Sequence, residues 1–157
     1  MPRFQPYDQA TVDSLRQGGP DANGQPAERA ISDGDGKPCR SCLRNVPAGQ
    51  EMLICAARPF PAPQPYAETG PIFLCADDCT PFDATGLPPI LTTSPDYLVK
   101  AYSADDRIIY GTGQITPVAQ IAGYAQTLLS RADVAYVDVR SARNNCFLTR
   151  TMTDEHP

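Results

Sequence analysis

The fold is decided by residues 96–140, DYLVKAYSADDRIIYGTGQITPVAQIAGYAQTLLSRADVAYVDVR. Residues 96–102 and 107–112 are short runs rich in apolar, aromatic and β-branched side chains, and each is predicted to be a strand. The residues SADD between them suit a hairpin turn. Residues 134–140 alternate between small apolar and larger polar side chains, which indicates a further strand.

A helix is expected between the second and third of these strands. Thr116 is a candidate N-terminal cap, and Pro117 suits the first helical turn, where a missing amide hydrogen costs nothing. Apolar residues then recur at helical spacing and give the helix one buried face. These residues are Val118, Ile121, Ala122, Ala125, Leu128 and Leu129.

The rest of the chain adds strands and one short helix. The apolar runs 52–57 and 71–75 are typical of strands covered on both faces, and residues 145–149 are predicted to be the last strand. A short helix is expected over residues 11–17, and residues 21–37 have the composition of a loop. Strand follows strand over most of the chain, so we expect an α+β fold. It would consist of a mainly antiparallel sheet of about six strands with one long amphipathic helix packed on one face.

The chain has 157 residues, a common size for one domain. We expect a single α+β domain over residues 37–152. Residues 1–36 are polar and rich in Gly, Pro and Asp, and are expected to be an irregular N-terminal segment with one short helix. Residues 153–157 are expected to be a flexible tail.

The formal net charge is −5. Nucleic-acid binding requires a basic surface, and anionic membranes attract the same positive charges. The sequence has neither an apolar run long enough to span a membrane nor the apolar core of a signal peptide. We therefore expect a cytoplasmic protein that binds neither nucleic acids nor membranes. The sequence indicates no oligomeric state.

The chain has six cysteines, and four of them form two close pairs. Cys39 and Cys42 form a C-x-x-C pair, and Cys75 and Cys79 form a C-x-x-x-C pair. In a reducing compartment metal ligation explains such pairs better than disulfides do. Zinc takes four tetrahedral ligands, which two pairs on two loops can supply. The sequence therefore predicts a four-cysteine zinc site.

Two alternatives stay open for these pairs. Cysteine is among the residue types most often buried, so the four can be structural thiols, as we expect of Cys55 inside an apolar strand. The other alternative is redox exchange. It requires a C-x-x-C pair that opens a helix, and Pro47 stops a helix soon after Cys42.

Cys146 stands apart from the pairs. Arg140 and Arg143 lie nearby in the sequence, and their charges favour the thiolate. This supports a second hypothesis, an enzyme in which Cys146 is a thiolate nucleophile or redox thiol assisted by Arg140 or Arg143. A core cysteine is the alternative. The single histidine, His156, lies near the chain end, which argues against Cys-His and Ser-His pairs and against a His-ligated catalytic metal.

Polar residues at predicted strand ends and in the proline-rich loop indicate a cleft for an anionic small molecule. Arginine forks bind carboxylates and phosphates, and solvated surface charge is the alternative. The candidate ligand-binding residues are Arg58, Tyr66, Glu68, Arg143 and Asn144. Residues 111–116 imitate a dinucleotide fingerprint, but they lack the third glycine and a parallel-sheet context, so no nucleotide site is predicted.

Several stretches are distinctive: PCRSCL (38–43), RPF (58–60), PYAETGPIF (65–73), DDRIIYG (105–111) and RSARNNCF (140–147). In these stretches the chain resembles a bacterial family known only as a domain of unknown function, DUF1203. The resemblance implies no activity. It implies that close relatives carry His in the place of Cys75, another zinc ligand, and that distant members lack the counterpart of Cys42. Zinc would then be confined to one branch of the family, or the pairs would not be ligands.

Overall fold

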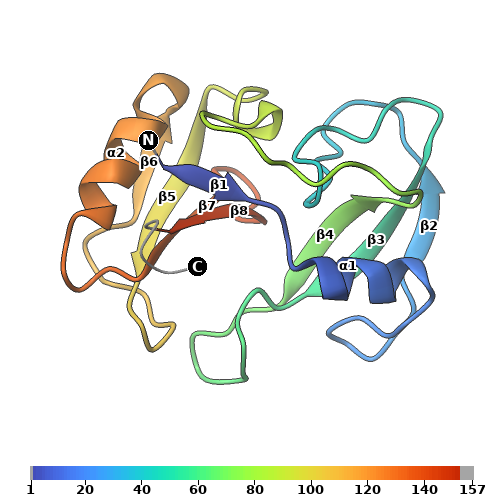
Figure 1. Ribbon diagram of the computed structural model, residues 1–157, viewed down its shortest axis with the longest axis horizontal. Helices are drawn as coiled ribbons and strands as arrows, with labels where there is room; N and C mark the ends of the chain where they lie inside the picture. Colours follow the sequence, from blue (N-terminus) through green and yellow to red (C-terminus); the bar gives the residue numbers. More distant parts are fainter. Residues whose placement is uncertain (1, 153–157) are drawn as a thin grey trace.

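A computed structural model describes residues 2–152 of the chain. These residues form two antiparallel sheets that lie side by side, one of five strands and one of three (Figure 1). The large sheet has the strand order β1-β8-β7-β5-β6. Its strands are β1 (Arg3–Gln5), β5 (Asp96–Tyr102), β6 (Gln114–Pro117), β7 (Tyr136–Ser141) and β8 (Phe147–Met152).

Helix α2 (Val118–Leu129) covers one face of the large sheet. It buries four residues of the expected apolar face: Ile121, Ala125, Leu128 and Leu129. They pack against Val99 of β5 and Val137 of β7, which point to the same side. Burial of each large apolar side chain stabilises the fold by roughly 1.5–3 kcal/mol, so this face forms the main core.

The small sheet has the strand order β2-β3-β4, with β2 (Glu28–Ile31), β3 (Glu51–Ala57) and β4 (Gly70–Cys75). Helix α1 (Gln9–Arg16) packs on it through the buried Val12 and Leu15. The Asp8 carboxylate caps this helix and accepts a hydrogen bond of 3.0 Å from the Thr11 amide. A single 3-10 turn, Pro89–Leu91, precedes β5.

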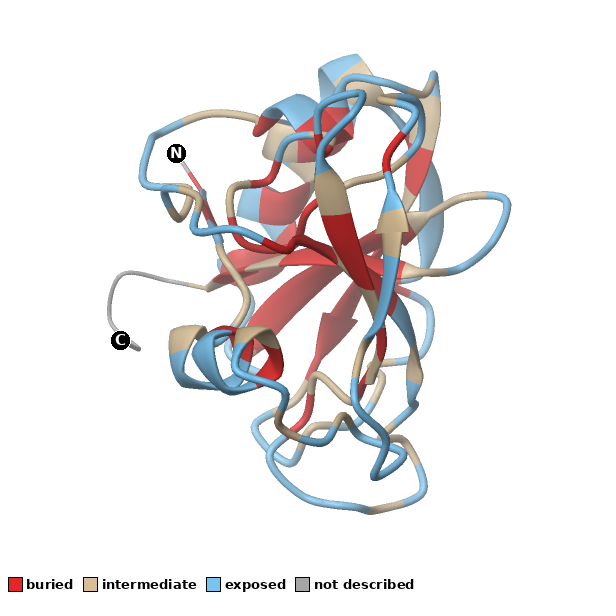
Figure 2. Ribbon diagram, turned by 90° about the vertical axis from the view of Figure 1, so that its right-hand side faces the viewer, coloured by how far each residue is buried: buried red, intermediate tan, exposed pale blue. Residues whose placement is uncertain are grey.

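The second face of the large sheet is covered as well, and Figure 2 shows buried residues along most of the strands. Phe60, from the proline-rich segment after β3, packs on Tyr102 and Tyr136 of this face. The rings of these two tyrosines are stacked, with centroids 5.2 Å apart. The polar side chains of β7 on this face, Asp138 and Arg140, are therefore enclosed between two layers.

The α+β class and the antiparallel pairing are confirmed, but the expected single sheet of about six strands is wrong. Residues 2–152 contain eight strands in two sheets. In the large sheet β5 pairs with β6 and β7 on its two sides, and β1 covers the outer edge of β8. In the separate small sheet β3 pairs with β2 on one side and with β4 on the other. The sequence does not indicate β1 and β2 because both are short and mostly exposed. Helix α1, at Gln9–Arg16, confirms the short helix expected over residues 11–17, whereas α2, with 12 residues, is not the long helix that was expected.

The strand expected at residues 107–112 is also wrong. These residues form an irregular turn, and β6 begins at Gln114. Asp106 and Gly111 have positive φ angles of 62° and 91°, which interrupt an extended strand. The Thr112 hydroxyl accepts a hydrogen bond of 3.1 Å from the Ala101 amide, so a side chain takes the place of a ladder carbonyl.

Thr116 does not cap α2. It lies in β6 opposite Tyr97, and its hydroxyl donates to the Gln114 carbonyl. Pairing with β5 holds Thr116 and Pro117 in an extended conformation, so Pro117 becomes the N-cap and the helix begins at Val118.

Residues 1–36 contribute more structure than the expected single helix. Within the described part of this segment, β1 pairs with β8, and Phe4 of β1 is buried in the core beside α2. The domain boundary between residues 36 and 37 stays a prediction. The predicted tail, which includes His156, lies outside the described residues. None of the helices within residues 2–152 has the length and apolar character needed to cross a membrane.

Candidate metal centre and ligand pocket

The first cysteine pair lies in a tight turn. The Cys39 amide donates to the Arg44 carbonyl (2.8 Å), and the Leu43 amide donates to the Cys39 carbonyl (2.9 Å). Leu43 has a φ of 56°, in the left-handed region that costs a non-glycine residue about 1–2 kcal/mol. Its side chain is fully buried in the core of the large sheet, and this burial offsets the strain. The turn therefore holds Cys39 and Cys42 in a defined conformation.

The second pair lies at the end of β4. Cys75 is the last residue of that strand, and Cys79 follows in the next loop. A parallel bridge joins Cys39 to Phe73 of β4, and the Arg40 amide donates to the Phe73 carbonyl (3.0 Å). This pairing brings the first turn alongside the end of β4. As a result, the Cys75 amide donates to the Sγ atom of Cys39 (3.3 Å).

The four paired cysteines form one cluster. The Sγ atoms of Cys39, Cys42, Cys75 and Cys79 all lie within 4.8 Å of one another. Those of Cys39 and Cys79 are 3.8 Å apart. Tetrahedral zinc has Zn–S bonds of about 2.3 Å, which places its sulfur ligands about 3.8 Å from each other. Cys39 and Cys75 are buried and the other two are partly exposed, so the cluster can hold a metal ion at the edge of the small sheet.

Hydrogen bonds among the thiols separate their pKa values. Those from Cys42 and Cys75 lower the pKa of Cys39 to about 6. Hydrogen bonds from Cys39, Cys42 and Cys75 lower the pKa of Cys79. The pKa values of Cys42 and Cys75 are raised because their thiols are donors to Cys39. Without a cation the cluster therefore keeps some of its protons, and a bound metal ion displaces them.

Arg16, at the end of α1, places a positive charge beside the sulfur atoms. Its Nη2 donates to Cys79 Sγ and its Nε donates to the Cys75 carbonyl, both at 3.1 Å. Only 9% of its side chain is exposed. Four thiolates around a divalent ion carry excess negative charge, which this guanidinium offsets. Arg16 precedes Cys75 by 59 residues, so no spacing motif in the sequence points to it.

A second candidate site, the inter-sheet pocket, has a volume of about 240 Å³ and lies between β3–β4 and the turn that joins β7 to β8. Residues predicted from the sequence to be catalytic or ligand-binding line it: Glu68, Arg140, Asn144 and Cys146. Its apolar wall includes Pro59, Pro71, Ile72 and Phe147. The fold thus brings together parts of both predicted sets, the ligand-binding residues and the catalytic residues.

The other predicted ligand residues lie elsewhere. Arg58 lines a neighbouring pocket of about 450 Å³. The hydroxyls of Tyr66 and Tyr110 are hydrogen-bonded to each other (3.0 Å) at the surface. Arg143 is exposed, and its Nη1 donates to the Asp96 carboxylate (3.0 Å), which directs its charge away from the pocket.

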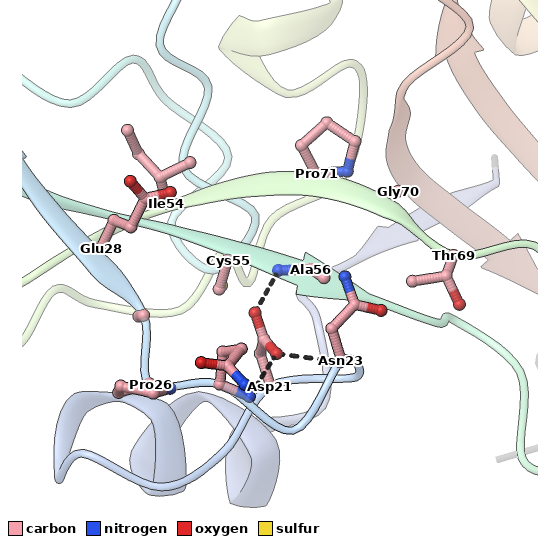
Figure 3. A pocket seen from close by; sticks show the side chains of 12 residues that line it. Asp21, Asn23, Pro26, Glu28, Ile54, Cys55, Ala56, Thr69, Gly70 and Pro71 are labelled. Carbon is pink, nitrogen blue, oxygen red and sulfur yellow. Dashed lines mark hydrogen bonds between the residues drawn. The ribbon is translucent and has the colours of Figure 1, made fainter.

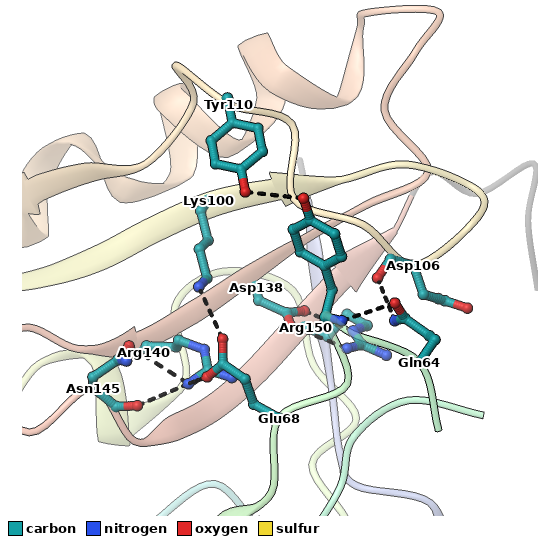
Figure 4. Close-up of polar contacts among 10 residues, drawn as sticks. Gln64, Glu68, Lys100, Asp106, Tyr110, Asp138, Arg140, Asn145 and Arg150 are labelled. Atoms are coloured by element: carbon teal, nitrogen blue, oxygen red, sulfur yellow. Dashed lines mark hydrogen bonds and ion pairs between the residues drawn. The ribbon is translucent and has the colours of Figure 1, made fainter. Parts of the chain in front are cut away.

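Figure 4 shows the ion pairs beside the inter-sheet pocket. Glu68 Oε2 lies 3.2 Å from Arg140 Nη1, and Glu68 Oε1 lies 3.9 Å from Lys100 Nζ. Arg140 Nη1 also donates to the Asn145 carbonyl (2.8 Å). Burial lowers the pKa of Lys100, and the charge of Arg140 lowers it further. Lys100 is not among the site residues predicted from the sequence, although a lysine within the apolar strand 96–102 is the signal that points to it.

A second ion pair on this face is more deeply buried. Arg150 donates to both carboxylate oxygens of Asp138, from Nε at 2.6 Å and from Nη2 at 3.0 Å. The Asp138 side chain is 0% exposed. Burial lowers the pKa of Arg150, but the charge of Asp138 and its hydrogen bonds, together with Tyr136 and Tyr102, outweigh burial and the pKa is raised. Arg150 Nη2 also donates to the Pro59 carbonyl (2.7 Å), so this guanidinium joins β8 to the segment after β3.

Cys146 ends the turn between β7 and β8. The Ser141 amide donates to the Cys146 carbonyl (3.0 Å), and the Cys146 amide donates to the Ser141 hydroxyl (2.9 Å). Asn145 has a φ of 56°, a left-handed conformation that asparagine tolerates well. The turn therefore holds Cys146, which is partly exposed, at the wall of the inter-sheet pocket.

Arg40 lies behind this wall and is only 3% exposed. Its Nε donates to the Phe147 carbonyl (2.8 Å), and its Nη1 donates to the Pro38 carbonyl (2.6 Å). Burial lowers the pKa of Arg40 to about 10, and the negative charges of Cys146 and Cys39 oppose this shift. The Arg40 guanidinium is thus held by the carbonyl groups of Phe147 and Pro38, near the thiols of Cys146 and Cys39.

A larger and more open pocket, of about 790 Å³, lies on the small sheet (Figure 3). Its Asp21 carboxylate accepts hydrogen bonds from the amides of Asn23, Gln25 and Ala56, and these bonds lower the pKa of Asp21. Cys55 at its wall is 4% exposed, and burial raises the pKa of this thiol to about 11. The Asp21 carboxylate therefore stabilises the turn around it. The expected burial of Cys55 is confirmed.

These features define a small α+β protein with a four-cysteine cluster at one sheet and a charged pocket between two sheets. Residues 36–152 match the profile of the family described as "Protein of unknown function (DUF1203)", and the chain belongs to this family. The resemblance seen in the sequence is thereby confirmed. Neither the curated proteins nor the solved structures include a significant match to the chain.

Proposed function

We propose that the protein is a zinc-binding module in which Cys39, Cys42, Cys75 and Cys79 hold one zinc ion. The observation that carries this proposal is the approach of the four sulfur atoms to within 4.8 Å of one another. Thiolates are soft ligands that suit zinc. Four protein ligands leave no coordination position for a substrate, so the ion is structural.

The zinc ion stabilises the contact between the two parts of the fold. The turn that carries Cys39 and Cys42 continues into Leu43, which belongs to the core of the large sheet. Cys75 ends β4 of the small sheet, and Arg16 brings α1 to the same centre. A metal in this position supports the scaffold, so the protein is better described as a binding module than as a metalloenzyme.

The proposal includes a reducing compartment such as the cytoplasm. All six cysteines are free thiols, and thiolates bind zinc only while they are reduced. The expectation that nucleic acids and membranes are not partners stays a prediction, based on the net charge of −5.

The metal content of protein purified without a chelator tests this proposal. We expect elemental analysis to find about one zinc ion per chain, as a closed four-thiolate site requires. A zinc content near zero contradicts the proposal. Another thiophilic metal at the same stoichiometry would keep the four-cysteine site and change the identity of its ion.

A second candidate function, a cysteine-dependent enzyme, is favoured by the position of Cys146 at the wall of the inter-sheet pocket. Arg140 lines the same pocket, whereas Arg143 is bound to Asp96. If this function is correct, Cys146 reacts with a neutral thiol reagent at neutral pH much faster than the buried Cys55 does, and the rate falls as the pH is lowered. A Cys146 thiol as unreactive as that of Cys55 in the folded protein would rule the enzyme out.

A further inference from the structure

Positive charge is in excess beside the inter-sheet pocket. Lys100 and Arg140 are both buried, with only 10% and 4% of their side chains exposed. They share one carboxylate, that of Glu68, which is itself 43% exposed. Buried charges in proteins are normally paired. Asp138 lies opposite Lys100, but its carboxylate is bound by Arg150, so the partly hydrated Glu68 is the carboxylate that Lys100 and Arg140 have as an ion-pair partner.

A third cation adds to this excess. Arg40 lies behind Phe147 and donates to main-chain carbonyls, and within residues 2–152 it forms no ion pair with a carboxylate. The Nε of Arg140 is also buried, and it has no hydrogen-bond partner in the described part of the chain. The protein as a whole carries a net charge of −5, so this positive charge is a local feature of the pocket.

We infer that the inter-sheet pocket binds a small organic anion, with its carboxylate against Arg140 and its apolar part against Phe147 and Pro71. Such an anion supplies the negative charge that the buried cations lack. The volume of about 240 Å³ lies below the roughly 300–1,000 Å³ of sites for drug-sized ligands, which suits a short-chain carboxylic acid. Asn144 and Asn145 line the same pocket and offer amide donors. A few polar groups on an apolar wall are typical of small-molecule sites.

This site is separate from the zinc centre and does not depend on it. The Cys146 thiol lines the same pocket as Arg140, so a bound carboxylate lies next to this cysteine. A carboxylate that carries a thiol-reactive group should therefore be directed to Cys146. The five remaining cysteines belong to the zinc cluster or to the core of the small sheet.

Iodoacetate and iodoacetamide provide the test, because one carries a carboxylate where the other carries a neutral amide. With either reagent a sulfur–carbon bond forms, the carbon–iodine bond breaks, iodide leaves and the thiol proton passes to the buffer. We expect iodoacetate to alkylate Cys146 at least about tenfold faster than iodoacetamide does, because the positive pocket concentrates the anion. The rate should also saturate at high iodoacetate concentration. Peptide mass spectrometry separates Cys146 from the partly exposed Cys42 and Cys79.

Competition in the wild-type protein tests the same site without a substitution. Butyrate should slow the labelling of Cys146 by iodoacetate to a saturable extent, and butyramide should not. Protection by inorganic phosphate but not by butyrate would overturn the assignment to a carboxylate.

Two arginines on the same β7–β8 hairpin form a matched pair of variants. Arg140→Gln should abolish the preference for iodoacetate. Arg143→Gln should retain it, because Arg143 is exposed and bound to Asp96. The inference is overturned if iodoacetate labels Cys146 no faster than iodoacetamide, with a rate linear in concentration. It is also overturned if the preference survives in folded Arg140→Gln.

Discussion

Replacing Cys39 with Ala should release the zinc ion and make the stability of the protein independent of chelators. Cys39 is fully buried, accepts the Cys75 amide hydrogen and lies 3.8 Å from the sulfur of Cys79. A ligand present at a hundred times its dissociation constant stabilises the folded state by about 2.7 kcal/mol. Urea unfolding should be measured with free zinc at a hundred times its dissociation constant. The free energy of unfolding of Cys39→Ala should then be lower than that of the wild type by at least about 2.7 kcal/mol.

Cys55→Ala is the matched control for this variant. Cys55 lies in the same buried cluster of side chains as Cys39 and is 4% exposed. Both substitutions therefore remove a sulfur atom from similar apolar surroundings. Cys55→Ala should keep its zinc and should still lose stability when a chelator is added. If both variants lose the same stability and a chelator leaves the wild type unchanged, the four cysteines are structural thiols and not metal ligands.

The effect of losing the metal should reach both sheets. Leu43 follows Cys42 and belongs to the core of the large sheet, and its carbonyl accepts the Ile90 amide hydrogen (3.1 Å). Arg16 connects the cluster to α1. Amide hydrogen exchange in Cys39→Ala should therefore be faster in α1 and around Ile90, while the centre of α2 stays protected.

Replacing Asp138 with Asn should destabilise the protein by about 3–5 kcal/mol, because it leaves the mostly buried Arg150 guanidinium without its anion. The carboxylate is 0% exposed and accepts two hydrogen bonds from Arg150. The same guanidinium lies 3.9 Å from the ring centre of Tyr136, which limits its ability to move into solvent. Urea or thermal unfolding of the purified variant measures the loss.

An exposed pair with the same geometry is the control. Arg131 donates from Nε and Nη2 to the two oxygens of Asp133, at 3.0 and 2.8 Å. These side chains are about half exposed, so Asp133→Asn should leave the free energy of unfolding unchanged within error. The double variant Asp138→Leu with Arg150→Met should lose less stability than Asp138→Asn alone, because no buried charge is left unpaired. Equal losses of unfolding free energy in Asp138→Asn and Asp133→Asn would contradict the prediction that the buried pair stabilises the fold more than the exposed pair.

Apolar periodicity predicted those elements whose buried faces are continuous. The spacing of Ile121, Ala125 and Leu128 predicted α2, and the apolar runs 52–57 and 71–75 predicted β3 and β4. The pattern is weak where local hydrogen bonds decide the structure. The Thr112 hydroxyl replaces a ladder acceptor, and strand pairing keeps Thr116 out of the helix.

The candidate site could be predicted only in part, for a related reason. The two cysteine pairs are local motifs, so the candidate ligands could be named from spacing alone, and the structure brings all four together. Arg16 reaches the same cluster across 59 residues, and Lys100 meets Glu68 only after the two layers pack. Contacts of this kind depend on the tertiary fold, and nothing in a local pattern records them.

Zinc K-edge X-ray absorption of the purified protein is the sharpest test of the four-cysteine zinc site, because it counts the atoms bound to the metal. We expect a single shell of four sulfur atoms at about 2.3 Å and no nitrogen or oxygen ligand. The same spectrum is expected for Cys55→Ala. A shell with fewer than four sulfur atoms, or the absence of bound zinc in protein that has never met a chelator, would contradict the four-cysteine zinc site.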